Sequence, residues 1–562
     1  MPMFSSDDQG ILQAGLRAVQ TKMGRPQSRL HGATMTALMK HGGLYTFLEP
    51  EMTSARLTPL MSGEHGSVIQ AALQKVQSTV ESFFYKLLPG KSYTINSDLM
   101  SFISFPHDGV AYEDPPPAIN KTIPAVFTFV GQFIDHDLTM NAVNLTLDQS
   151  NSVIVDNASP VIDLDSVYGP RTILNNALHV DDQGNHWDIF NEDGTFKLDP
   201  VGNGFDLPRF KQDPLEPAYI VDGRNDENQL ILQIHILVMR VHNALIKSEP
   251  AGHWGQTRDE IITAVRKEVV LNWQSVVLHD YMPKIIEPKT LEFILTEIKT
   301  ENYGALKHKP LRDLVTGCNV VRMPHEFAIG FRFGHSQLRP SYQLNGGPSI
   351  LLFNNRKVEQ TDDLRGSRKL AASHVIDWDV FYPLQAKPEH DSLAIDGKIT
   401  PAVFDLPETA IPDDIKFVGN LPQRNLIRSR MIGVASGEEL ADFYNVPELP
   451  ETDIVDETKY PQAKALFTHD GPFKTPLWYY ILKEAEKKGG GEMLGPLGSR
   501  LVGEVLAGGI YYGDDFRFDD NWKSQITGKN EVTLRDLINY GTKLFQNKQR
   551  WSERYGKHPA GT

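Results

Sequence analysis

The chain has 562 residues, a formal charge of −15, and a composition that is 40% hydrophobic and 23% charged. This composition supplies a large hydrophobic core and excludes a wholly disordered chain. The acidic balance argues against nucleic acid and anionic membrane surfaces as general partners. Cys318 is the single cysteine, so no intrachain disulfide can form, and we expect its thiol to be buried and structural.

Targeting signals are not evident in this sequence. Its first 24 residues hold no apolar segment of signal-peptide length, and no uncharged segment approaches the ~20 residues that span a bilayer. We therefore expect a soluble protein with no transmembrane segment, either cytoplasmic or exported without a standard signal peptide. The lack of disulfides and of a signal peptide also suggests a bacterial source.

Helical periodicity is the main pattern along the chain. Apolar residues alternate in steps of four and three over residues 64–88, which predicts an amphipathic helix within an N-terminal helical extension, residues 1–90. The same steps predict helices from Gln229 to before Pro250 and from about Asp259 to His279.

Strand-like alternation is scarce, whereas 44 glycines and 36 prolines indicate long irregular loops. Three regions stand out as loops, at residues 90–120, 185–225 and 340–420. We therefore expect a mainly α fold, in which one large helical domain with little β structure occupies residues 91–562. Loops of this length usually serve a functional site.

Residues 122–140 read TIPAVFTFVGQFIDHDLTM, an apolar helix whose first turn suits Pro124. Gln132 and His136 are four residues apart and point to the same side of that helix, with Asp135 near them. Two interpretations remain open. The segment is a helix end with solvated acids around a structural histidine, or it faces a cavity where His136 and Gln132 act as base and positioning group.

An acidic loop follows about twenty residues later. Ser159, Val161, Asp163 and Asp165 are spaced by two, so an extended loop places their oxygen atoms on one side. Oxygen ligands suit a hard cation such as Ca2+, and Asp137 could complete the cage from the helix. The loop lacks the spacing of an EF-hand, and an acidic loop taken alone is more often only solvated.

The sequences GQFIDHDLT and DLDSVYG in these two segments resemble the animal-type haem peroxidases of the peroxidase-cyclooxygenase superfamily. In that family a helix histidine is the base above haem, and the aspartate after it binds calcium. The resemblance implies that His136 is this base and that Gln132 is its neighbour. It also implies a set of calcium ligands, namely Asp137, Ser159, Val161 through its backbone oxygen, Asp163 and Asp165.

The sequence DGRNDEN, residues 222–228, precedes the helix that begins near Gln229, and Asp226 could cap that helix. Arg224 and Glu227 taken alone suit a cap or a surface ion pair. The family, however, has a catalytic arginine three residues before a glutamate at the start of a long helix. Arg224 therefore resembles the arginine that polarises the O–O bond, and Glu227 a carboxylate that can form an ester with haem.

The long helix continues as MRVHNALI, which also resembles the family, and we expect its His242 to be structural. The family's second haem ester would come from Asp135. Asn228 stands where the strongest chloride oxidisers carry a methionine that links to haem through sulfur. The resemblance therefore implies haem b, ester-linked in this interpretation, and donors other than chloride.

The third motif is HEFAIGFRFGHSQL, residues 325–338, in which Gly334 precedes His335. Haem iron in a peroxidase needs one axial imidazole, and a small neighbour lets the porphyrin approach the backbone. FRFGHSQL resembles the family's proximal motif, so we assign His335 as the iron ligand and Arg332 as a partner of a haem propionate. His325 is the rival, although it suits a helix start better.

A proximal histidine in this family donates its second N–H to an asparagine. Aligning ITPAVFD, residues 399–405, with that region places Asp405 beside His335. The later sequence NLIRSR, residues 425–430, resembles the family's arginine-rich segment. The resemblance covers roughly residues 90–450, and its three motifs occur in the family's order.

The resemblance implies a haem peroxidase that reduces hydrogen peroxide and oxidises bromide, iodide, thiocyanate or phenolic donors through an oxyferryl intermediate. One alternative is a fatty-acid dioxygenase of the same superfamily. Such an enzyme needs a tyrosine radical near the haem. In cyclooxygenase-like members this tyrosine lies three residues before the proximal histidine, a position that is Arg332 here. Another tyrosine, such as Tyr382, would have to take that role. Another alternative is a non-catalytic binding module, which should have lost one of His136, Arg224 or His335.

Overall fold

The computed structural model describes the chain in fifteen stretches. They are residues 36–40, 43–47, 84–104, 118–139, 141–142, 155–156, 160–169, 178–180, 186–212, 215–312, 319–354, 362–407, 419–469, 471–513 and 517–543. Cys318, Ser159 and most of the predicted helix at 64–88 lie outside these stretches.

Helices dominate the described residues, as the sequence predicts. The longer ones are α4 (Ser97–Ser104), α5 (Val126–Leu138), α7 (Gln229–Ser248), α8 (Arg258–Val276), α10 (Pro288–Lys299), α13 (Leu421–Ile432), α14 (Gly437–Tyr444), α17 (Leu477–Lys488), α18 (Pro496–Tyr511) and α19 (Leu534–Lys543). Shorter ones are α6 (Asp165–Tyr168), α9 (Met282–Ile285), α11 (His325–Gly330), α12 (Trp378–Phe381), α15 (Glu451–Ile454) and α16 (Ala463–Phe467).

Strands occur only as short pairs within the described residues. The pairs are β1 (Thr36–Lys40) with β2 (Gly43–Phe47), β3 (Phe84–Tyr85) with β13 (Met323–Pro324), β4 (Ile119–Pro124) with β16 (Asp391–Leu393), β5 (Asn141–Ala142) with β6 (Val155–Asp156), β7 (Leu178–Val180) with β8 (His186–Asp188), β9 (Asp199–Val201) with β10 (Gly204–Asp206), β11 (Leu311–Arg312) with β12 (Asn319–Val320), and β14 (Ser341–Tyr342) with β15 (Ile350–Leu351). The fold is therefore mainly α.

The N-terminal region differs from its predicted helical form where it is described. Strands Thr36–Lys40 and Gly43–Phe47 pair antiparallel, and Phe84–Tyr85 pair in parallel with Met323–Pro324. The predicted helix at 64–88 is therefore wrong at its C-terminal end. The backbone N–H of Leu87 donates to the buried carboxylate of Glu326, which fixes this segment to the start of α11.

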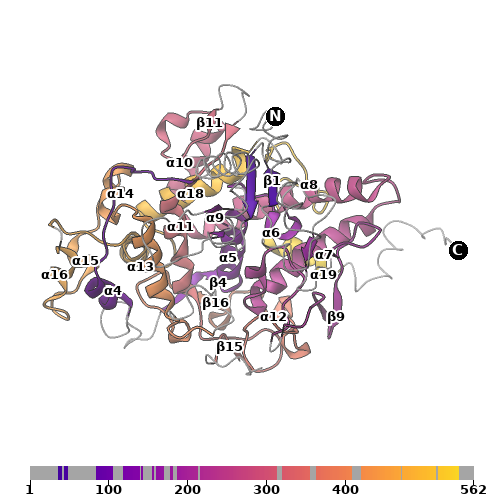
Figure 1. The fold of residues 1–562 in the computed structure, drawn as a ribbon, viewed down its shortest axis with the longest axis horizontal. Coiled ribbons are helices and arrows are strands. Elements are labelled where there is room, and N and C mark those ends of the chain that lie inside the picture. Colours follow the sequence, from indigo (N-terminus) through magenta and orange to yellow (C-terminus); the bar gives the residue numbers. More distant parts are fainter. Residues whose placement is uncertain are drawn as a thin grey trace, which may run out of the picture.

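Helix α5 occupies the middle of the molecule, with α7 and α19 side by side on one flank and α11 and α13 on the other (Figure 1). It begins at Val126, because Pro124 ends strand β4 instead of entering the first helical turn. Its apolar side chains are buried almost all round the helix, which explains why the sequence there is apolar without a polar face. The polar groups at its C-terminal end therefore lie in the interior.

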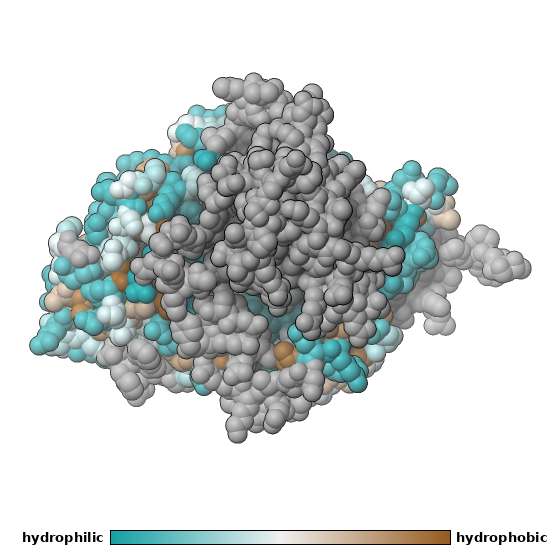
Figure 2. Space-filling model, viewed as in Figure 1, coloured by the Kyte–Doolittle hydropathy of each residue, from teal (hydrophilic) through white to brown (hydrophobic). Residues whose placement is uncertain are grey.

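Helix α7 begins where the sequence predicts, and Asn228 caps it by accepting from the N–H groups of Leu230 and Ile231. Among the described helices, α7 is long and apolar enough to cross a membrane, but 94% of the relevant window is buried within the protein, as in a core helix. The predicted helix at 259–279 corresponds to α8 and continues into a π-helical turn, Val277–Tyr281. The described surface in Figure 2 is mainly hydrophilic.

Candidate active site

His136 lies in the last turn of α5 and is buried. Its Nδ1 atom is 2.9 Å from Oδ1 of Asn225. Because an amide oxygen only accepts, Nδ1 carries the proton and Nε2 keeps a lone pair. Burial, and next the charge of Arg224, lower the pKa of His136 to about 4. The imidazole is therefore neutral at pH 7 and its Nε2 atom can accept a proton.

Arg224 approaches His136 from a 3-10 turn, Gly223–Asp226, that precedes α7. Its Nη2 atom donates to the backbone carbonyl of His136 at 2.9 Å and to Asp222 at 2.7 Å. Asp222 is buried, so the pair holds a guanidinium at a fixed position beside the imidazole. The turn thus delivers Arg224 and Asn225 to His136 together.

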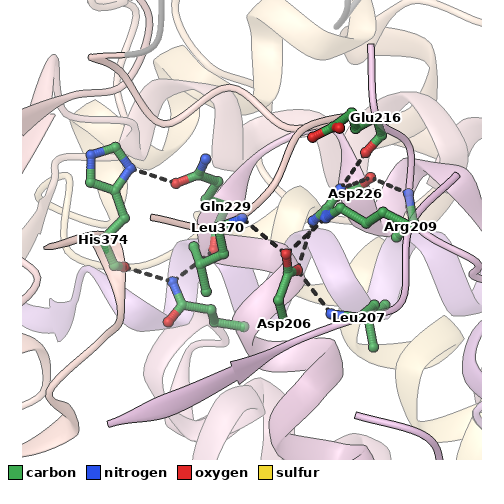
Figure 3. A network of polar contacts seen from close by, with 10 residues as sticks. Asp206, Leu207, Arg209, Glu216, Asp226, Gln229, Leu370 and His374 are labelled. Carbon is green, nitrogen blue, oxygen red and sulfur yellow. Dashed lines mark hydrogen bonds and ion pairs between the residues drawn. The ribbon is translucent and has the colours of Figure 1, made fainter. Parts of the chain in front are cut away.

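Asp226 anchors this turn and does not cap α7, so the predicted capping role is wrong. Its carboxylate pairs with Arg209 at 2.9 Å and accepts from the N–H of Ala218, and Asp206 binds the same guanidinium (Figure 3). The loop at Gly366 and Ser367 also packs closely on the turn: both N–H groups donate to its backbone carbonyls, and a Cβ atom on Gly366 would collide with the carbonyl of Asp226. The backbone of the turn is therefore fixed from two sides.

The side chains of Gln132, on α5, and Glu227, directly after the 3-10 turn, contact each other. The Nε2 atom of Gln132 donates to Oε1 of Glu227, and Asn228 donates to Oε1 of Gln132 at 3.3 Å. Burial raises the pKa of Glu227 to about 7, against the lowering effect of Arg224 and Arg424. Glu227 is therefore an unusually weak acid for a carboxyl group.

His335 lies in a 3-10 segment, Phe331–Gln337, that follows α11 and contacts α5. Burial lowers its pKa to about 3, helped by Arg332 and Arg424. Its Nδ1 atom is 2.9 Å from the amide of Asn425, on α13. Oδ1 of Asn425 is buried without a partner among the described residues, and a 180° rotation of the amide would bring it to Nδ1. The ring would then donate from Nδ1 and leave the Nε2 lone pair for a metal.

This contact corrects the prediction for Asp405. Asp405 is exposed, and Asn425 occupies the position beside His335 that the alignment gave to the aspartate. Residues 408–418 separate the two segments and lie outside the described residues. The sequence NLIRSR therefore carries the partner of His335 at its first position.

Several charged side chains between the two histidines are only partly enclosed, although they lie deep in the protein. They are Asp135, Arg224, Glu227, Arg332 and Arg424. Burial lowers the pKa of Arg332, while Asp135 and Glu227 raise it and Arg224 lowers it, so these groups share one space. Partial exposure in the interior indicates a cavity lined by both signs of charge.

The residues around this space fit a haem group. The Oδ1 atom of Asp135 is buried without a hydrogen-bond partner in the described part of the chain. The Nε atom of Arg332 donates to a backbone carbonyl. Among the described residues, no carboxylate forms an ion pair with Arg332. An imidazole, an unpaired cation and an orphaned carboxylate oxygen are the groups that iron, a propionate and an ester bond require.

The acidic loop folds against the end of α5. One carboxylate oxygen from each of Asp137, Asp163 and Asp165 lies within 4.8 Å of the others, and all three residues are buried. Asp137 accepts from the N–H groups of Asp163 and Leu164, while Gln274 holds the carbonyl of Ile162 at 2.7 Å. Three buried carboxylates this close repel one another, so the cluster suits a hard cation. Val161 lies in this loop, and Ser159 is outside the described residues.

The remaining histidine and tyrosine candidates lie elsewhere. His325 begins α11 and is ten residues before His335. The ring nitrogens of His242 contact the hydroxyl of Tyr168 and the carbonyl of Gly194, both at 3.0 Å, which agrees with a structural role. Tyr382 packs on Phe127, nine residues before His136, which is about 14 Å along the helix.

Four polar residues of this site are absent from the sequence assignments: Asp222, Asn225, Arg424 and Asn425. Asn225 is adjacent to the assigned Arg224, Asp222 and Asn425 begin quoted motifs, and Arg424 directly precedes Asn425. Local patterns could not identify the two asparagines as partners of the histidines, because Asn225 and Asn425 lie 89 and 90 residues from the histidines that they contact.

The family model described as animal haem peroxidase matches residues 146–551, which include Arg224, Glu227, His335 and Asn425. The chain therefore belongs to the animal haem peroxidase family. The chain is also 29% identical over 136 residues to Heme peroxidase 2 of Caenorhabditis elegans, a match that covers 23% of this chain and 17% of that relative.

Solved structures agree on the fold. Peroxidase A from Dictyostelium discoideum is similar with a TM-score of 0.55 and 15% identity, over 82% of this chain and 93% of that one. The fatty acid alpha-dioxygenase of Oryza sativa gives 0.54 and 12%, over 83% and 79%. The fatty acid alpha-dioxygenase of Arabidopsis thaliana gives 0.52 and 11%, over 84% and 78%.

Proposed function

We propose that the protein is a haem peroxidase that uses hydrogen peroxide to oxidise bromide, iodide, thiocyanate or phenolic donors. The observation that carries this proposal is the arrangement of a neutral, buried His136, oriented by Asn225, with the Arg224 guanidinium fixed beside it. Bound haem supplies the iron that accepts the peroxide and stores its oxidising equivalents.

The chain's own residues manage the proton and the charge. Nε2 of His136 takes a proton from the inner oxygen of hydrogen peroxide and returns it to the outer oxygen, which leaves as water. Arg224 stabilises the negative charge that develops on the departing oxygen. Asn225 holds the imidazole in the tautomer that this transfer requires.

His335 would hold the haem iron through Nε2 in this proposal, because Asn425 fixes its Nδ1 atom. Arg332 would hold a propionate. Asp135 and Glu227 would form the ester bonds, and mass spectrometry of acid-extracted haem tests this. Freely extractable, unmodified haem would exclude the esters. Because Asn228 cannot form a sulfur link, chloride is not an expected donor.

Calcium is the second cofactor in this proposal. Asp137, Asp163 and Asp165 supply buried carboxylate oxygens, and the Val161 carbonyl and Ser159 complete the predicted ligands. Asp137 follows His136 directly, so the ion would fix the end of α5. Calcium would thereby hold the base in position without contacting peroxide.

The deciding experiment is a steady-state assay of the holoenzyme with hydrogen peroxide and either a phenolic donor or bromide. We expect turnover that His136→Leu lowers by about 10²–10⁴-fold while the haem spectrum is retained. His242→Gln, at a buried histidine whose ring nitrogens contact Tyr168 and Gly194, is the matched control and should keep the activity. Turnover unaffected by His136→Leu would overturn the proposal.

A fatty-acid dioxygenase is the second candidate, and one observation favours it. Tyr281 packs so closely on α5 that a Cβ atom on Gly131 would collide with its hydroxyl. Burial, and next the charge of Asp135, raise the pKa of Tyr281, so its phenol lies within electrostatic range of that carboxylate. This places a tyrosine nearer the cavity than Tyr382. Oxygen uptake with linoleate and no added peroxide, lost in Tyr281→Phe, would establish this activity. A non-catalytic module would show neither reaction.

A further inference from the structure

A second pocket lies beside α7, away from the two histidines. Its volume is about 580 Å³, which is in the range of small-molecule sites. The walls come from α7, the β9–β10 hairpin, the segment 372–379 and α19. Along α7, Arg240 in this pocket is eleven residues beyond Gln229, or about 16 Å from the end of the helix that faces the cavity.

Arg240 lines this pocket and is only 9% exposed. Its Nε atom is buried without a partner, and no carboxylate forms an ion pair with its guanidinium within the described residues. The guanidinium lies over the ring of Phe205, 5.0 Å from its centroid. Burial lowers the pKa of Arg240 to about 10, and no acid in the described part of the chain offsets this effect.

Two other buried arginines of this protein are compensated by acids. Arg209 pairs with Asp206 and Asp226, and Arg365 pairs with Asp363 at 2.6 Å. An uncompensated buried guanidinium destabilises a fold, because it loses hydration without gaining a counter-charge. Arg240 therefore has the property expected of a group whose counter-charge is a ligand.

The rest of the pocket restricts what that ligand can be. Phe205, Ile236 and Trp378 contribute apolar surface. Asp377 and Asp379 also line the pocket and are exposed, and Asp379 is partly neutralised by Arg535 at 3.1 Å. Acids toward the solvent side disfavour ligands with several negative charges. A single carboxylate attached to an apolar body satisfies both conditions.

We propose that this pocket binds a small organic monocarboxylate, whose carboxylate pairs with Arg240 and whose apolar part packs against Phe205 and Trp378. A guanidinium is suited to this role because it binds a carboxylate through two parallel hydrogen bonds. The site is independent of the proposed peroxidase reaction, and its ligand need not be a donor.

The test is titration calorimetry of the holoenzyme with benzoate, hexanoate and, separately, inorganic phosphate. We expect one of the two carboxylates to bind, with affinity at least about tenfold weaker in Arg240→Gln, as the loss of a charge-assisted pair predicts. Arg258→Gln is the matched control, because it removes a positive charge from a surface pair with Asp188 and should leave binding unchanged.

A second variant leaves Arg240 intact. Thr542 lines the pocket from α19 and is partly exposed, so Thr542→Phe should fill space without disturbing the core, and it should also weaken binding. Thermal melts separate binding from a structural role. Ligand-free Arg240→Gln should melt at or above the temperature of the parent protein, and the carboxylate should no longer raise it.

Four results would overturn the proposal. The first is no binding of either carboxylate, and the second is binding that is equally strong in Arg240→Gln. The third is phosphate binding with the same dependence on Arg240, which would make the site one for inorganic oxyanions. A large fall in the melting temperature of ligand-free Arg240→Gln would likewise assign Arg240 to the fold.

Discussion

On each side of the cavity an asparagine orients a histidine ring, but the electrostatic surroundings of the two rings differ. His136 and His335 are both enclosed, and each has Nδ1 fixed by an asparagine, Asn225 and Asn425 respectively. The acids Asp222 and Asp135 face His136 together with one arginine, whereas the charged neighbours of His335 are arginines. Acids nearby help an imidazole to hold a proton briefly, and cations nearby keep it neutral.

This difference would let one residue type serve the two roles proposed for His136 and His335. A base must accept and release a proton within each turnover, and a metal ligand must never be protonated. The surroundings of His136 suit the first requirement, and those of His335 suit the second. The following variants test whether the two sides differ in this way.

The largest effect is expected for His335→Ala. Removal of the axial ligand should abolish or strongly alter the haem absorption band of the purified protein, and peroxidase activity should fall to background. His325→Ala, at the start of α11, is the control and should keep the band. If the two variants gave the same spectrum as the parent protein, the assignment of the proximal side would be wrong.

Removal of the proposed calcium ion tests only the side of the cavity that holds His136. Asp137→Asn, or treatment with a calcium chelator, should leave a buried acidic cluster without its counter-charge and cost about 3–5 kcal/mol of stability. Thermal denaturation with and without added Ca2+ measures this. An Asp193→Asn variant, at an acid outside the cluster, should keep the response to calcium. A chelator that leaves the melting temperature unchanged would exclude a structural ion.

The two asparagines can be compared directly. Asn425→Ala should weaken haem retention by about 10–100-fold, the usual effect of losing the partner of a metal-ligating histidine. Asn225→Ala should retain haem and lower the rate of peroxide reduction instead. Asp405→Asn should change neither, because this side chain is exposed. Haem loss in Asn225→Ala with full retention in Asn425→Ala would reverse the assignment of the two sides.

His242 provides a reference for a buried histidine outside the cavity. Burial lowers its pKa to about 4, whereas the ordinary value is 6.5. Below pH 6.5 the unfolded chain therefore binds a proton at this histidine, whereas the folded protein does not bind it until the pH falls to about 4. The contribution of His242 to the free energy of unfolding is fully present above pH 6.5 and falls by about 1–3 kcal/mol as the pH drops to 4. Urea unfolding at several pH values in this range measures the free energy of unfolding. In His242→Gln this free energy should change less steeply with pH than in the parent protein, and an equally steep change would contradict the assignment.

Much of the fold and part of the site could be predicted from the sequence. Periodicity located α7 and α8, and the order of three motifs pointed to the family that the family model then confirmed. Local patterns could not show that Asn425 is beside His335, because ninety residues separate them. The same limitation applies to Asn225, whose partner is 89 residues earlier. The bacterial source and the cellular location stay predictions.

The strand at Phe84–Tyr85 was missed for a physical reason. Its pairing with Met323–Pro324 is parallel and joins segments more than 200 residues apart in the chain, so no local pattern predicts it. Arg240 shows the converse limitation. Its sequence, MRVHNALI, is typical of a core helix, and only the structure shows that no described acid pairs with its guanidinium.

The spacing between each histidine and its asparagine also constrains biosynthesis. A ribosome can release residue 225 from its exit tunnel well before residue 425. The segment that holds His136 and Asn225 can therefore fold while the segment that holds His335 and Asn425 is still being translated. His335 acquires its orienting partner only when α13 has emerged. Under the proposed role of His335, a truncated translation product ending before α13 should not retain porphyrin.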